Sequence, residues 1–339
     1  MKYSARSCLE HNKIIRWYLL GTVFLAVSGI LGIVLGSTSL TLGEIQEGFR
    51  HGFQTPGGRI FAYVRFPRTA AALLCGAALS VSGAVIQGVL ANRLASPSII
   101  GVNAGAGLAV TLCSALGILG GWQMSFFAFL GAFLSVMVVS LGARRWGASR
   151  GTVILMGVAL NSLLGAITNT VTTFLPEVGM MSNDFKIGEF SAVTYARLLP
   201  AAVIILCVIL VLRTLHNELD VLTLGEESAR GLGLNTSWMR TVFLLLAAML
   251  AGCAVSLAGL LSFVGLLVPH AVRRVAGSRS SDLMGLCALF GAGFVCLCDT
   301  LARTLFAPYE IPVGILMAYL GAPFFVFILV KGKGGHSRD

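Results

Sequence analysis

The segment at residues 63–90 reads YVRFPRTAAALLCGAALSVSGAVIQGVL. Arg65 and Arg68 stand on either side of Pro67, and no charged residue follows until Arg93. An apolar run of this length can cross a bilayer, which takes about 20 mostly apolar residues. Two permanent positive charges are excluded from lipid, so they mark a boundary of the membrane. The segment therefore predicts a transmembrane helix with an arginine pair at one end.

The composition of the chain also indicates a membrane protein. Of its 339 residues 56% are hydrophobic and 11% are charged, with a mean hydropathy of +0.88, whereas soluble domains average about 25% charged residues. The net charge of +10 does not indicate nucleic acid, because the basic residues are scattered singly between apolar runs. The eight cysteines contain no CxxC pair, so neither a disulfide framework nor a metal site is expected.

Ten apolar segments predict an all-α polytopic membrane protein with about ten transmembrane helices in a single domain over residues 1–339. They lie near residues 14–36, 66–90, 97–117, 122–142, 152–175, 195–213, 240–259, 260–272, 283–305 and 311–330. The first exceeds the roughly 7–15 apolar residues of a signal peptide, and we interpret it as an uncleaved helix. The seventh and eighth are joined by the glycine-containing Ser256–Ser262 segment, which predicts a broken helix buried in protein.

The distribution of lysine and arginine predicts the orientation of these helices. With the N-terminus in the cytoplasm, 17 of the 24 basic residues fall in inside segments and 7 in outside segments. The positive-inside rule selects this direction. Both termini are then cytoplasmic, Arg65 and Arg68 face outward, and Leu215–Met239 is the largest inside loop.

The charged residues also bear on the energy source. Ion-coupled transporters generally carry ionisable residues at membrane depth, but Asp299 is the one acidic residue of this sequence within a predicted span. It stands four residues before Arg303, on the same helix face, so both a local ion pair and a proton relay remain open. The sequence has no GxxxxGK[ST] or HExxH motif, which argues against an ATP site and against metalloprotease chemistry. Active transport would therefore need energy from a partner.

The inside segment LDVLTLGEESARGLGLN, at 219–235, is short, amphipathic and interrupted by glycines. Glu226 to Arg230 can form one or two helical turns, and we expect Gly231 to end them in a left-handed cap. Two short helices here would form a rigid knob that inserts into a soluble partner. An ordinary solvated loop is the alternative.

The fifth predicted span carries a face of polar and small residues. Asn161, Gly165, Thr168 and Thr172 follow each other at spacings of 4, 3 and 4, which places them on one side of a helix. Such a face suits a wet translocation path through the membrane. Hydrogen bonding between helices explains the same pattern.

Four long stretches occur together and in order. They are RFPRTAAALLCGAALSVSGAVIQG at 65–88, LTLGEESARGLGL at 222–234, GLLSFVGLLVPHAVRR at 259–274 and DTLART…YEIPVGILMAYLGAPFF at 299–325. From about Ile15 to Lys331 the chain thereby resembles the FecCD-type permeases, the membrane subunits of ATP-driven importers for iron–siderophores, haem and cobalamin. The resemblance implies a transport subunit, not an enzyme, in a bacterial or archaeal cytoplasmic membrane.

The resemblance also implies the partners. They are a second permease copy, most simply in a homodimer with the substrate path between the copies, two cytoplasmic ATPase subunits that hold ATP and Mg, and an extracytoplasmic binding protein. No cofactor is expected on this chain. A stand-alone ion-coupled secondary transporter is the alternative function. The substrate stays open among an iron–siderophore, haem and cobalamin.

Three groups of site residues follow from the resemblance. The segment that couples to the ATPase centres on Leu224, Gly225, Glu226, Ala229, Gly231 and Gly233, and the cytoplasmic gate lies near Ser149, Gly151 and Thr152. The binding protein docks through acidic residues on Arg65, Arg68 and Arg303, since a guanidinium keeps its charge and presents a fork that matches a carboxylate. Arginines that snorkel to lipid headgroups are the alternative.

Overall fold

The computed structural model describes residues 2–37, 42–50 and 52–333, and these contain helices but no β-strand. Ten helices match the ten predicted segments. They are α1 (Lys2–Val34), α4 (Phe66–Val89), α5 (Val102–Ala115), α6 (Gly121–Arg145), α7 (Arg150–Phe174), α10 (Tyr195–Thr214), α13 (Thr236–Ala258), α14 (Val264–Ala276), α15 (Ser280–Thr304) and α16 (Val313–Lys333). Seven spans in the described part are long and apolar enough to cross a membrane. The apolar parts of α5 (Val102–Ala115) and α16 (Val313–Val326) are shorter, as is α14. The predicted fold class is confirmed.

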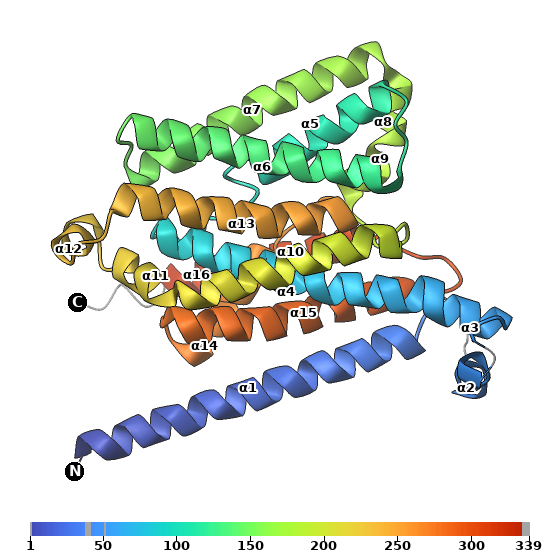
Figure 1. The fold of residues 1–339 in the computed structure, drawn as a ribbon, viewed down its shortest axis with the longest axis horizontal. Coiled ribbons are helices and arrows are strands. Elements are labelled where there is room, and N and C mark those ends of the chain that lie inside the picture. Colours follow the sequence, from blue (N-terminus) through green and yellow to red (C-terminus); the bar gives the residue numbers. More distant parts are fainter. Residues whose placement is uncertain (1, 38–41, 51, 334–339) are drawn as a thin grey trace.

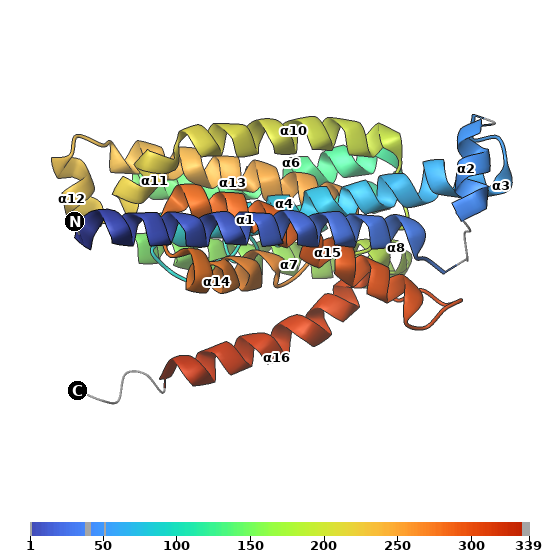
Figure 2. The same ribbon diagram turned by 90° about the horizontal axis from the view of Figure 1, so that it is seen from below.

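The remaining elements are short and lie at the ends of the bundle. They are α2 (Leu42–Arg50), α3 (Pro56–Ile60), a π-helical turn η1 (Phe61–Arg65), α8 (Pro176–Met181), α9 (Asn183–Ile187), α11 (His216–Thr223) and α12 (Glu226–Gly231). The start of α1, the end of α16 and α12 lie at one end of the bundle, while α2 and α3 lie at the other (Figures 1 and 2). The first end is the one that the charge distribution assigns to the cytoplasm.

Helix α4 forms the centre of the bundle, packed against α13, α14 and α15 (Figure 1). Its glycines allow this close packing. A Cβ added at Gly83 would lie 1.8 Å from the carbonyl oxygen of Gly265, and one at Gly76 would lie 2.2 Å from that of Gly291. Small residues at such crossings let membrane helices approach backbone to backbone. The segment that begins with the arginine pair is therefore the core helix of the fold.

The predicted break between the seventh and eighth spans is confirmed. Helix α13 ends at Ala258 and α14 begins at Val264, and Gly259 and Phe263 between them have φ values of 70° and 66°. The unwound backbone hydrogen-bonds with the outer loop at 182–193: the amide of Leu260 donates to Phe185, and that of Glu189 donates to Ala258. Non-helical backbone at membrane depth is tolerated because protein groups satisfy it in this way.

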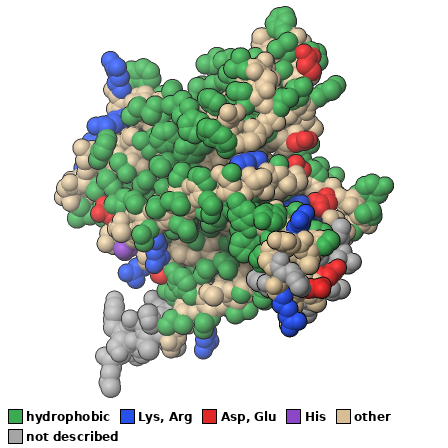
Figure 3. Space-filling model, turned by 45° about the vertical axis from the view of Figure 1, so that its right-hand side comes forward, with side chains coloured by type: hydrophobic (Ala, Val, Ile, Leu, Met, Phe, Trp, Pro, Cys, Tyr) green, Lys and Arg blue, Asp and Glu red, His purple; other side chains and the backbone are tan. Residues whose placement is uncertain are grey.

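Two helices leave most of their surface unpartnered within the chain. In α7 the buried residues are Val153 and Gly157, and α16 diverges from the rest of the bundle (Figure 2). Hydrophobic side chains cover much of the flank, while charged side chains gather in scattered groups (Figure 3). Exposed apolar surface of this extent indicates contact with lipid or with another protein chain.

Candidate functional sites at the two ends of the bundle

The π-helical turn η1 lies directly before α4 and ends at Arg65, which reaches the end of α1. Arg65 Nη1 donates to the carbonyl oxygens of Ile33 (3.0 Å) and Val34, and Arg303 Nη2 donates to that of Gly32 (3.0 Å). The last carbonyl groups of a helix have no partner within the helix, and its C-terminal end carries a partial negative charge. The two guanidinium groups therefore cap α1 and match its dipole.

Asp299 is the anion that holds two arginines together. Arg68 binds it with Nε at 3.2 Å from both carboxylate oxygens and with Nη2 at 3.0 Å from Oδ1, while Arg303 Nε lies 3.1 Å from Oδ2. Asp299 is fully buried. The ion pair with Arg303 that the sequence allowed is confirmed. Both carboxylate oxygens serve this network, which gives no support to a proton relay.

Glu310 completes this group on the outer side, in the turn between α15 and α16. Its Oε2 accepts from Arg68 Nη1 at 2.7 Å and its Oε1 accepts from Ser37 Oγ at 2.8 Å. Burial opposes its ionisation, but the hydrogen bonds and charge of Arg68, the hydroxyl of Ser37 and the charge of Arg303 outweigh this and lower the pKa of Glu310. The sequence analysis did not single out Glu310, although it stands within the YEIPVG motif.

The structure brings the three predicted docking arginines together at the outer end, and it buries them. Arg65, Arg68 and Arg303 are 3%, 7% and 3% exposed. Their hydrogen bonds go to α1, Asp299 and Glu310, so a carboxylate from another protein would have to compete with these partners. They do not extend toward headgroups, as snorkelling requires. Their docking role stays a prediction.

The cytoplasmic segment forms two short helices, α11 and α12, as predicted. Gly225, with a φ of 113°, separates them. The predicted cap at Gly231 is wrong, because Gly231 is the last helical residue and Gly233 adopts the left-handed conformation with a φ of 82°. The amide of Leu234 donates to Ala229 and that of Gly233 donates to Arg230, which is the Schellman arrangement.

Ion pairs and hydrogen bonds tie this two-helix knob, residues 216–234, to the membrane helices. Glu226 accepts from Arg230 at 2.7 Å and from Arg240 of α13 at 3.1 Å. Arg240 also donates to the carbonyl oxygen of Ala148, and Arg150 of α7 donates to that of Leu222. The knob is therefore held against the cytoplasmic start of α7.

The surface of the knob is apolar at two points. Leu224 and Leu232 are 64% and 66% exposed, whereas Ala229 is fully buried. Gly225, Gly231 and Gly233 have open space where a Cβ would lie. The sequence analysis named Leu224 but missed Leu232, which the GLGL pattern does not distinguish from a core residue. Two exposed leucines on a braced knob form a candidate contact surface for a soluble partner.

The predicted gate residues lie at the first turn of α7, next to the knob. Ser149 is the N-cap, and its Oγ accepts from the amide of Thr152 at 3.3 Å and lies 3.0 Å from the hydroxyl of Thr152. Ser149, Gly151 and Thr152 are exposed. The contacts of Arg150 and Arg240 join this turn to the knob.

The predicted path face of α7 is turned partly toward its own chain. Asn161 Nδ2 donates to the carbonyl oxygens of Ser98 and Ile99 at 2.9 and 3.0 Å, and Thr168 bonds back to Leu164. Asn161, Gly165, Thr168 and Thr172 are half-buried. Asn161 is thus held by the loop that precedes α5, a contact within its own chain. The fully exposed side of α7 carries Ser162, Asn169, Thr170 and Thr173 instead, and a path role for either face remains a prediction.

Comparison with known proteins identifies the family. The chain matches the FecCD transport family over residues 24–331. It is 34% identical to the uncharacterized ABC transporter permease protein YvrB of Bacillus subtilis (strain 168), over 94% of this chain and 95% of that one. It is 32% identical to the vitamin B12 import system permease protein BtuC of Yersinia pseudotuberculosis, over 94% and 93%.

Solved structures agree with this result. A structure described as an inward-facing conformation of a metal-chelate type ABC transporter matches with a TM-score of 0.81 and 29% identity, over 94% of this chain and 99% of that chain. The PsaBC structure from Streptococcus pneumoniae matches with a TM-score of 0.59 at 15% identity, which shows a shared fold. The chain belongs to the FecCD transport family. It is a multi-pass membrane permease of an ABC importer.

Among the described residues, no cluster of three or more His, Cys, Asp and Glu side chains could hold a metal ion. The free cysteines of this part are mostly buried in the helix bundle.

Proposed function

We propose that the chain is a single permease domain that translocates an iron–siderophore or a related chelate, such as haem or cobalamin. The likeness to a vitamin B12 permease and to a metal-chelate type transporter supports this substrate class. An extracytoplasmic binding protein delivers the cargo, and two separate ATPase subunits, which hold ATP and Mg, drive the transport. The chain itself binds no cofactor and carries out no catalysis.

One observation carries the proposal: the knob at the cytoplasmic end is braced on the start of α7. Glu226 and Arg240 connect α12 to α13, and Arg150 connects α7 to the end of α11. Leu224 and Leu232 stand free on its surface. A nucleotide-driven partner that pushes on these leucines would move the first turn of α7, where Ser149, Gly151 and Thr152 form the gate.

The unpartnered faces of α7 and α16 support a homodimer. The side chains of Tyr319, Leu320 and Val326 on α16 are exposed, and the exposed side of α7 is polar toward its outer end. A second copy that packs on these faces would enclose a path lined by α7 from both copies. A polar helix face is costly in lipid and favourable beside a wet path.

The outer cluster supports docking of a binding protein through exchange of carboxylates. Glu310 forms an ion pair with Arg68. It lies in a turn in which the side chains of Phe306 and Tyr309 are exposed. An acidic residue of the binding protein would replace Glu310 on Arg68. Substitution of Glu310 by Ala should then strengthen the capture of the binding protein by the purified importer. Equal affinity of Glu310→Ala and the unchanged chain would exclude this exchange.

Reconstitution separates the importer from the stand-alone ion-coupled transporter. Proteoliposomes that contain this chain, its ATPase subunits, internal ATP and the external binding protein should take up the chelate. Liposomes that contain the chain alone, with a proton or sodium gradient, should take up none. Gradient-driven uptake by the chain alone would overturn the proposed function.

A further inference from the structure

Arg197, near the outer end of α10, is a cation without an acidic partner in the described part of the chain. Its Nη1 and Nη2 donate to the carbonyl oxygens of Ala192 and Ser256, both at 2.9 Å. Its Nε is buried and has no hydrogen-bond partner among the described residues. None of the ion pairs of these residues includes it. A desolvated guanidinium with an unused donor favours a bound anion.

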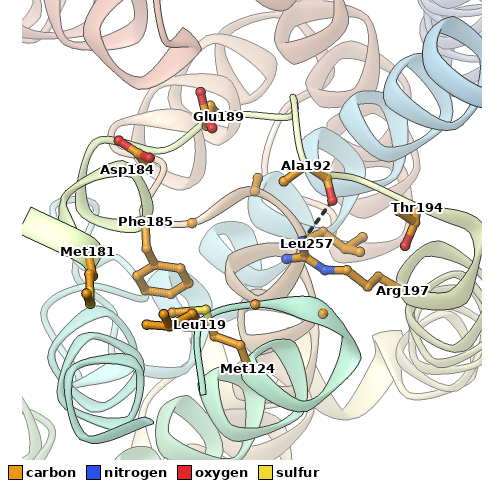
Figure 4. Close-up of a pocket in the computed structure, with 14 residues that line it drawn as sticks. Leu119, Met124, Met181, Asp184, Phe185, Glu189, Ala192, Thr194, Arg197 and Leu257 are labelled. Atoms are coloured by element: carbon orange, nitrogen blue, oxygen red, sulfur yellow. Dashed lines mark hydrogen bonds between the residues drawn. The ribbon is translucent and has the colours of Figure 1, made fainter. Parts of the chain in front are cut away.

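Arg197 lies where two hollows meet. The outer cavity of ≈ 520 Å³ opens at the outer end of the bundle, with Arg197 on one side and Asp184 and Glu189 on the opposite rim (Figure 4). The flank groove of ≈ 230 Å³ runs between α6 and α10 and is lined by aromatic and aliphatic side chains, among them Phe126, Phe129 and Ile204. Arg197 contributes to both. The outer cavity carries charged side chains at its rim, and the flank groove is mainly apolar.

The flank groove opens on an apolar surface of the bundle that suits contact with lipid. Beside it, Leu199, Val203, Leu206 and Leu210 form an exposed apolar stripe along α10, at the spacing of a single helix face. On α6, Trp122 is 62% exposed at the outer end of the groove, a position at which tryptophan marks the membrane interface. Helices α6 and α10 lie on the face of the bundle opposite α16 (Figure 2).

Polar groups in both hollows define the headgroup. Ser125 lines the flank groove, is 9% exposed, and has no hydrogen-bond partner for its Oγ in the described residues. The outer cavity combines one guanidinium with two carboxylates, so it matches a group that carries both signs. A phosphate pairs with Arg197, and a primary ammonium, which can donate hydrogen bonds, pairs with Asp184 or Glu189.

We propose that an aminophospholipid of the outer leaflet binds here, with one acyl chain in the flank groove, its phosphate on Arg197 and its ammonium toward Asp184 and Glu189. The anionic rim disfavours a lipid of net negative charge. A choline headgroup is disfavoured because its quaternary nitrogen has no proton to donate. The site is separate from the knob and from the arginine cluster at α1, so the lipid acts as a structural ligand of the α6–α10 contact.

Native mass spectrometry of the detergent-purified chain tests this site. The chain is mixed with equal amounts of phosphatidylethanolamine, phosphatidylcholine and phosphatidylglycerol that have the same acyl chains. One phosphatidylethanolamine should be retained about tenfold over the others, the ratio for one charge-assisted hydrogen bond of about 1.4 kcal/mol. Equal retention of the three lipids would overturn the proposal.

Variants separate the parts of the site. Arg197→Gln should lower retention of phosphatidylethanolamine about tenfold, while Arg213→Gln, at the other end of α10, should leave it unchanged. Ala196→Phe fills the groove without touching the hydrogen bonds of Arg197 and should lower retention of all three lipids. This variant decides the test if Arg197→Gln fails to fold. If Ala196→Phe retained the lipids as well as the unchanged chain does, binding of an acyl chain in the flank groove would be excluded.

The carboxylates and the lipid tail have their own controls. The double variant Asp184→Asn and Glu189→Gln should keep a bound lipid but lose the preference for phosphatidylethanolamine. Glycerophosphoethanolamine, the headgroup without acyl chains, should not displace the lipid even in large excess. Displacement by this soluble compound, or by inorganic phosphate, would show a site for soluble phosphates and would exclude a lipid site.

Discussion

The substitution Asp299→Asn tests the network that holds the outer end of the bundle. Asp299 is fully buried and neutralises Arg68 and Arg303, which are themselves 7% and 3% exposed. Loss of its charge leaves two buried guanidinium groups, of which only Arg68 keeps a second carboxylate, Glu310. Removal of one partner from a buried ion pair costs about 3–5 kcal/mol. Asparagine keeps one acceptor oxygen, so we expect about 3 kcal/mol, toward the lower end of that range.

The effect should extend to α1 because Arg303 also caps that helix through Gly32. Thermal unfolding of the purified chain in detergent, followed by the loss of the monodisperse peak in size-exclusion chromatography, measures the change. A matched control is Asp282→Asn, in the first turn of the same helix α15. Asp282 interacts there with the helix dipole, which contributes about 0.3–1 kcal/mol. If both variants unfolded at the same temperature, Asp299 would not hold the arginines as inferred.

Three further predictions concern the knob and the outer turn. The double substitution Leu224→Asp and Leu232→Asp should abolish ATP-driven uptake without a change in thermal unfolding, and normal uptake in proteoliposomes would show that the ATPase contacts another surface. Gly233→Ala should destabilise the knob by about 1–2 kcal/mol because of its left-handed φ, whereas the helical control Gly231→Ala should be neutral or slightly stabilising. Hydrogen exchange of α12 distinguishes the two, and equal protection would contradict the cap. The lowered pKa of Glu310 means that its ion pair stabilises the chain above the pKa of an unfolded glutamate, near 4.3, and is lost as the pH falls through the lower folded pKa. The unchanged chain should therefore unfold at a higher temperature than Glu310→Gln at about pH 6, and this difference should shrink as the pH falls to about 3. A constant difference would argue against the ion pair.

The burial of the arginine cluster also changes how docking can be tested. Reversing the charges of Arg65, Arg68 and Arg303 together would remove the cap of α1 and place two anions directly beside Asp299. Such a variant would lose its fold along with any docking surface. Glu310 is the better probe, since it is partly exposed and lies at the outer edge of the network.

The ten helices, their order along the chain and the end of the bundle at which each one starts were predicted from the sequence alone. A span depends on the length and polarity of a continuous segment relative to a bilayer, and both are local properties. The ion pair of Asp299 with Arg303 was equally local, because residues four apart share a helix face. The break between the two short helices of the knob, at Gly225, was also indicated by a glycine that interrupts the pattern. In each case the sequence pattern and the structural feature that it predicts involve residues that are close together in the chain.

Only the tertiary structure decided which groups accept the hydrogen bonds of these arginine and asparagine side chains. Arg65 and Arg303 reach α1, more than 30 and 270 positions away in the chain, and Asn161 turns to the loop at Ser98 and Ile99. No local pattern distinguishes such contacts from exposure to a partner or to a wet path. A hydropathy pattern reports how much a segment avoids water, but the partner of a charged group depends on which distant backbone the packing brings beside it.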